Sequence, residues 1–181
     1  KAPKPWKSTK PWRQPALAQY RSFVEFVDVH STDTTQDSIW VLNVLELIAN
    51  HLATTRNDIK TIQLWADNAG CYHNATILRI APLLFGTSSI DLTSFRFFEA
   101  GEGKSILDRH FASVRHATVN SVKDGHAFDS GSAIENVLRS LSGVTTYFLQ
   151  PERAVPAHFE ARRQQKQKKI DKIASMHDFR Y

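Results

Sequence analysis

The order of apolar and polar positions predicts alternating strands and helices along most of the chain. Residues 20–30 alternate between apolar and polar side chains, which is the two-residue period of a half-buried strand. Residues 37–52 follow a hydroxyl- and acid-rich segment that offers an N-cap, and they are apolar on nearly all sides. They therefore predict a helix buried against a sheet, and the short apolar run 60–66 predicts a central strand after it.

The next part of the chain continues the alternation. Residues 73–84 predict a short helix that stops near Pro82, and residues 92–99 predict another strand. Residues 104–122 predict a helix, because apolar residues recur on roughly one face of it. The residues of that face are Ile106, Phe111, Val114 and Val119.

Three more elements complete the prediction. They are a helix over 129–142, a strand over 144–150 and a basic helix over 156–178. Strands and helices that alternate in this way indicate an α/β domain.

Length and charge divide the chain into a body with two basic ends. The 181 residues, 41% of them hydrophobic, are enough for one folded domain with small additions. The formal net charge is +5, but residues 1–13 hold five Lys or Arg and no acid, and residues 152–181 hold eight against four acids. The acidic middle excludes a uniformly basic coat. We expect a basic arm over 1–19, an α/β domain over 20–151 and a basic helical extension over 152–181.

Both ends have the composition of nucleic-acid contacts. Residues 1–15 hold four of the seven prolines and the near-repeat KPWKSTKPW, which predicts an extended arm. Lysine beside tryptophan suits phosphate contact and stacking on a base, although the tryptophans could instead pack on their own protein. Residues 162–172 hold six Lys or Arg and one Asp, which suits phosphate contact or a solvated helix face.

Cys71 is the only cysteine, which excludes an internal disulfide and a zinc site of the usual kind. No signal peptide and no apolar run of membrane-spanning length is visible, so we expect an intracellular protein without a membrane contact. The first residue, Lys1, and a single methionine at position 176 indicate a fragment or a processed chain.

Two stretches carry the candidate chemistry. Within residues 62–76, an apolar strand ends in Asp67 and a Gly-containing turn leads to a helix. Sheets of α/β proteins place ligands and metal ions at such strand ends, although Asp67 and Asn68 could simply cap the next helix. Within residues 95–116, a strand leads through a Gly-rich loop to a helix with Asp108 in its first turns.

Together these motifs resemble the retroviral integrase and DDE transposase family, which has an RNase H-like fold. The match consists of LWADNAG at residues 64–70, FFEAGEGK at 97–104 and Asp108-Arg109. The form of these motifs looks like a transposon-derived branch found in animal genomes, and the resemblance covers roughly residues 20–125. It implies an RNase H-like mixed sheet flanked by helices.

The resemblance also implies a metal site. Family members hold two Mg²⁺ ions between three carboxylates, roughly 3.5–4 Å apart, for phosphodiester chemistry. Asp67 takes the place of the second carboxylate and Asp108 of the third, where the family usually has Glu. Glu102 ranks second for the third position, and Glu99 is a weaker rival. Mg²⁺ is expected as a cofactor only if the domain is catalytically active.

The first carboxylate has no clear match. Asp28 lies on a strand that leads directly into the helix 37–52, a position that corresponds to the third strand of the family rather than the first. The first catalytic strand therefore lies upstream of Lys1 or is lost, unless Asp28 replaces it. The incomplete set indicates a catalytically degenerate domain.

Three functional hypotheses follow. The first is a domesticated domain that binds DNA or RNA, with a nuclear location favoured. The second is an active metal-dependent nuclease or strand transferase. The third is a structural subunit of a large ribonucleoprotein, such as a ribosome in the cytoplasm or an organelle, with other subunits as partners. Cys71 and His73 are expected to pack beside Asp67. The candidate nucleic-acid-binding residues are Lys4, Trp6, Lys7, Lys10, Trp12, Arg13, Lys104, Arg109, Arg115, Arg162, Arg163, Lys166, Lys168, Lys169 and Lys172.

Overall fold

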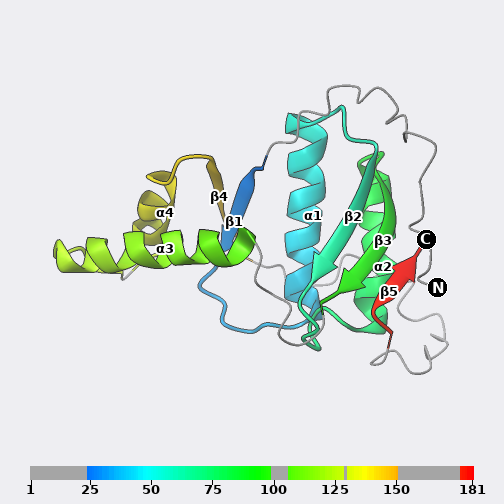
Figure 1. Cartoon of the computed structure of the whole chain (residues 1–181), viewed down its shortest axis with the longest axis horizontal. Coiled ribbons are helices and arrows are strands. Elements are labelled where there is room, and N and C mark those ends of the chain that lie inside the picture. The colour runs from blue at the N-terminus through cyan, green and yellow to red at the C-terminus, as the bar shows by residue number, and fades with distance from the viewer. Residues whose placement is uncertain (1–23, 99–105, 129, 151–175) are drawn as a thin grey trace, which may run out of the picture.

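The protein is α/β, as the sequence predicts (Figure 1). The computed structural model describes residues 24–98, 106–128, 130–150 and 176–181. The predicted basic arm, Glu99, Glu102, Lys104 and the basic helix up to residue 175 lie outside these residues. The elements are β1 (Phe26–His30), α1 (Ser38–Thr55), β2 (Thr61–Ala66), α2 (Ala75–Thr87), β3 (Asp91–Phe97), α3 (Ile106–Lys123), α4 (Gly131–Arg139), β4 (Val144–Phe148) and β5 (Asp178–Arg180).

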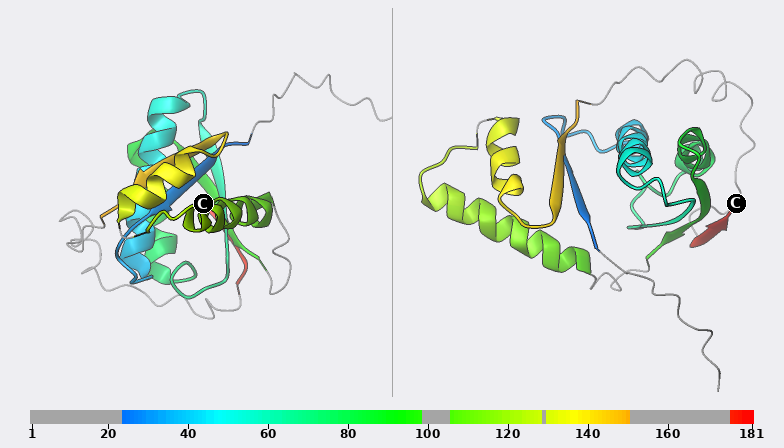
Figure 2. Two further views of the ribbon diagram at one scale, coloured as in Figure 1. Left: turned by 90° about the vertical axis from the view of Figure 1, so that its left-hand side faces the viewer. Right: turned by 90° about the horizontal axis from the view of Figure 1, so that it is seen from above.

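The described strands form two sheets. β1 pairs in parallel with β4, while β2 pairs in parallel with β3, and β5 is antiparallel to β3. β1 and β2 both run downwards in Figure 1, but Figure 2 shows that β1 crosses the direction of β2 obliquely. They do not pair with each other, so the described residues form two sheets rather than the single mixed sheet that the resemblance implies.

The core lies between the second sheet and two helices. α1 and α2 cover one face of the β2–β3–β5 sheet, and no described helix covers the opposite face (Figure 2). The two helices present apolar side chains to the sheet over several turns, which is why burial holds them there. The most deeply buried residues are Ala49, Ile77, Ala81, Leu84, Phe85, Ile90 and Phe95.

The predicted end of α2 near Pro82 is wrong, because the helix continues to Thr87. The Asn74 side chain caps its first turn by accepting from the backbone amides of residues 76 and 77. Pro82 has no amide hydrogen to donate to the carbonyl of Leu78, four residues earlier. The hydroxyl of Tyr181 donates to that carbonyl instead, at 2.8 Å.

The predicted helix over 156–178 is also wrong at its end. Met176 and His177 are not helical, and Asp178 begins β5. The strand is preferred here because Phe179 packs against the core and pairs with Phe95 on β3. At the other end of the chain, the strand predicted from residue 20 begins at Phe26 within the described residues.

The predicted inward face of α3 is largely exposed. Ile106 is 42% exposed, Phe111 64% and Val119 43%, and His110 is the only buried residue of the helix. The helix extends away from the β2–β3–β5 sheet and lies beside α4 (Figure 1). No helix among the described residues is both long and apolar enough to cross a membrane.

Candidate functional site

Asp67 lies at the carboxyl end of β2, where the sequence places it. The amide of Phe98 donates to the carbonyl of Ala66 at 3.1 Å, so β2 and β3 stay joined up to this edge. Asp67 is exposed, and its carboxylate accepts from the backbone amide of Asn68 at 2.7 Å. The carboxylate therefore faces solvent at the point where parallel sheets present ligand-binding groups.

The turn after Asp67 is fixed by packing. His73 is buried, its Nδ1 is hydrogen-bonded to the side chain of Asn68, and its ring stacks on Phe97 with centroids 4.2 Å apart. Cys71 is half-buried against the core. Burial raises the pKa of Tyr72, and negative charge on the neighbouring Cys71 and Asp67 raises it further. The Cys71–His73 segment thus holds the turn in place, in agreement with the packing role expected from the sequence.

Asp28 on β1 binds His110 on α3. Both carboxylate oxygens of Asp28 lie close to His110 Nε2, at 2.7 and 2.9 Å. An ionised carboxylate only accepts, so Nε2 carries the hydrogen. The His110 ring is buried and stacks on Phe26 with centroids 4.0 Å apart. Asp28 therefore attaches β1 to α3, a contact that the sequence reasoning did not anticipate.

Asp108 lies in the first turn of α3, as predicted, and is exposed. It lines a shallow hollow together with Phe111, Arg115 and other residues of the same helix. Arg109 and Arg115 are exposed, which suits contact with a partner and equally suits solvation.

A two-metal site is not assembled among the described residues. No group of three His, Cys, Asp or Glu side chains lies close enough together there to hold a metal ion. Asp28, the candidate substitute for the first carboxylate, directs both oxygens at His110. Asp67, Asp108 and Asp28 by themselves therefore do not fit a pair of Mg²⁺ ions, and Glu102 lies outside the described residues.

An aromatic and basic surface lies beside Asp67 on the face of the sheet that no described helix covers. Trp65 is 51% exposed, and the guanidinium of Arg96 lies over its ring, 5.1 Å from the centroid. The ring of Phe98 lies 5.4 Å from that of Trp65. We call Trp65, Arg96 and Phe98 the open-face cluster. Sequence reasoning missed it, although the alternation in β2 places Gln63 and Trp65 on one face.

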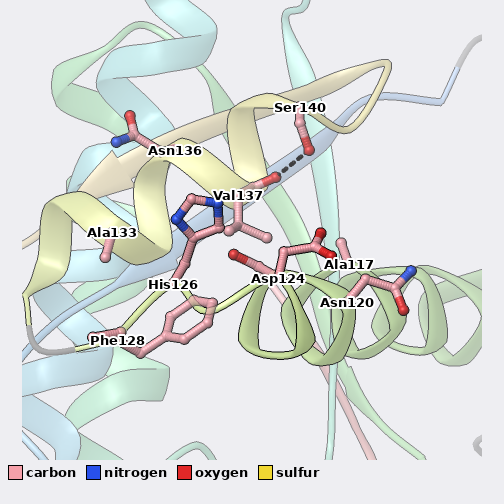
Figure 3. A pocket seen from close by; sticks show the side chains of 11 residues that line it. Ala117, Asn120, Asp124, His126, Phe128, Ala133, Asn136, Val137 and Ser140 are labelled. Carbon is pink, nitrogen blue, oxygen red and sulfur yellow. Dashed lines mark hydrogen bonds between the residues drawn. The ribbon is translucent and has the colours of Figure 1, made fainter.

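A cavity lies between the end of α3 and α4 (Figure 3). Its volume is about 550 Å³, and Asn120, Asp124, His126 and Asn136 are its main polar lining residues. No Lys or Arg lines it, and the carboxylate of Asp124 would repel a phosphate. It is therefore a poor candidate for a phosphate contact.

No protein-family model, curated protein or solved structure matches this chain.

Proposed function

We propose that the chain binds nucleic acid through the open-face cluster, with its basic ends in contact with phosphates. The observation that carries this proposal is the half-exposed ring of Trp65 with Arg96 over it. Aromatic rings on an open sheet face provide stacking platforms for unpaired bases. Asp178 partly offsets the charge of Arg96, because its carboxylate lies 3.3 Å from Arg96 Nε, so stacking on Trp65 is the main contribution expected. A single strand is therefore the preferred ligand.

We further propose that the domain has an RNase H-like fold of integrase or transposase descent. The order β1–α1–β2–α2–β3–α3 supports this, as does the position of Asp67 after β2 and of Asp108 in the first turn of α3. The engagement of Asp28 by His110 favours a binding domain with degenerate catalysis over an active transferase.

Salt dependence of binding tests the phosphate contacts. The full chain is titrated against fluorescein-labelled single-stranded DNA and RNA of the same sequence, at several salt concentrations, by fluorescence anisotropy. Changing Lys166, Lys168, Lys169 and Lys172 to Gln should lower the slope of log K against log salt by about 0.7 for each phosphate that these lysines neutralise. An unchanged slope would mean that these lysines of the basic extension do not contact phosphates. Binding restricted to RNA would favour the ribonucleoprotein subunit.

A cleavage assay tests the catalytic part separately. Labelled DNA and RNA are incubated with the full chain in Mg²⁺ or Mn²⁺, and Asp67→Asn serves as the control. We expect no cleavage above background from either protein. Metal-dependent cleavage that Asp67→Asn abolishes would contradict degenerate catalysis and support an active metal-dependent nuclease.

A further inference from the structure

A cavity of about 550 Å³ lies between the two sheets. One water molecule occupies about 30 Å³ in the liquid, so this space has room for several side chains. Residues of β1, β2, β3, α1, α3 and α4 line it, together with Tyr72, and most of them are apolar. Examples are Val29, Val44, Ile48, Leu64, Val114 and Leu138.

Two of the strands that line this cavity, β1 and β2, have an open edge among the described residues. Among the described residues, β1 pairs only with β4, and β2 pairs only with β3. Each strand therefore has one edge where no described strand meets its backbone donors and acceptors. Unpaired edges of this kind are templates for another strand. Figure 2 shows that β1 runs obliquely to β2, so one inserted segment would pair with both edges by twisting along its length, as strands in sheets do.

Buried polar atoms at the cavity also lack partners. Both ring nitrogens of His30 and the indole nitrogen of Trp40 are buried and have no hydrogen-bond partner within the described part of the chain. Both residues line the cavity. Since buried polar atoms nearly always have a partner in folded proteins, these atoms indicate that a polar group from elsewhere completes this region.

We propose that an extended segment of a partner polypeptide inserts between β1 and β2 as a β-strand. The backbone of this segment pairs with the open edges of β1 and β2. Every second side chain is apolar and fills the cavity between the two sheets. Asp28 is the only Asp, Glu, Lys or Arg among the lining residues, and its carboxylate accepts from His110. A nucleic acid would find no cation there, so a neutral, apolar segment without proline is the matching occupant. This partner is additional to the proposed nucleic-acid ligand.

Hydrogen exchange with selected peptides tests the insertion. Linear peptides are selected from a displayed library on the full chain, and the best one is synthesised with and without N-methyl groups on alternate residues. The unmethylated peptide should slow exchange of amides in residues 26–30 and 61–66 by roughly ten-fold or more. The methylated peptide should protect neither strand, because it lacks donors. A failed selection, absent protection, or equal binding by the methylated peptide would each overturn the proposal.

A variant that fills the cavity provides a second test. Val44→Trp should weaken peptide binding by roughly ten-fold or more, whereas Val122→Trp, a 56% exposed valine outside the cavity, should not. Circular dichroism confirms that both variants are folded. Should Val44→Trp misfold, Ile48→Phe replaces it. Equal binding by both variants would overturn the proposal. Protection of residues 26–30 by an oligonucleotide, or of both strands by raised protein concentration alone, would also overturn it.

Discussion

The hydroxyl of Tyr181 donates a 2.8 Å hydrogen bond to the backbone carbonyl of Leu78. This carbonyl is the one that Pro82 leaves without its helical partner, because proline has no amide hydrogen. The bond joins the residue after β5 to the fourth residue of α2. It explains how α2 passes through Pro82 and continues to Thr87.

Removing the Tyr181 hydroxyl should destabilise the fold only while Pro82 is present. We expect Tyr181→Phe to lower the free energy of unfolding by about 0.5–1 kcal/mol, the net contribution of one hydrogen bond. In a Pro82→Ala background, the backbone amide of the new alanine can donate to the carbonyl of Leu78, so the same change should cost much less. Urea unfolding of the four proteins in this double-mutant cycle measures the coupling. Equal costs in both backgrounds would disprove the capping role.

Stability should fall at high pH partly through Tyr181. Burial raises the pKa of Tyr181 to about 12, above the ordinary value of about 10. Its contribution to stability is therefore complete below about pH 10 and is lost as the pH rises towards 12. Urea unfolding between about pH 9 and 11 should show a shallower decline for Tyr181→Phe than for the wild type. Identical declines would contradict this assignment. Both proteins retain Tyr72, whose pKa is also raised, so the stability of Tyr181→Phe should still decline to some extent at high pH.

His51 should be the main polar link between α1 and the β1–β4 sheet. Its Nδ1 lies 2.7 Å from the hydroxyl of Tyr147, and its Nε2 lies 3.1 Å from the carboxylate of Glu25. We expect His51→Leu to lower the free energy of unfolding by about 1–3 kcal/mol, because it removes a buried partner from both Tyr147 and Glu25. Thr145→Val, which removes another donor to Glu25 at a more exposed position, should cost less than about 0.5 kcal/mol. Similar effects of the two variants in urea unfolding would contradict this role.

Asp28 should hold α3 against β1. Asp28→Asn removes the charge that His110 Nε2 faces, and we expect it to lower the free energy of unfolding by about 1–3 kcal/mol. Arg115→Gln, at an exposed position of the same helix, should change it by less than about 0.5 kcal/mol. Amide exchange in residues 106–114 should accelerate in the first variant alone. Acceleration in neither variant would contradict the attachment.

The sequence predicts the local elements better than their assembly. Asp37 and Asn74 cap α1 and α2, close to the predicted helix starts, because caps are short-range signals. The extension of α2 past Pro82 depends on Tyr181, about a hundred positions later in the chain, and no local pattern contains it. The exposed face of α3 has the same period as a buried one, so periodicity alone could not place it. The positions of Asp67 and Asp108 on their elements were predicted, whereas the binding of Asp28 to His110 required the fold.

The proposed recognition of nucleic acid depends most directly on Trp65. Affinity of the full chain for a fluorescein-labelled single strand is measured by anisotropy for the wild type, Trp65→Ala and Leu83→Ala, with folding of each checked by circular dichroism. Leu83 is the matched control, because it is an exposed apolar residue on α2, behind the sheet. We predict that Trp65→Ala weakens binding about ten-fold or more, the effect of losing one stacked base, and that Leu83→Ala leaves it unchanged. Equal affinities for all three proteins, or no binding by the wild type, would contradict nucleic-acid recognition by the open-face cluster.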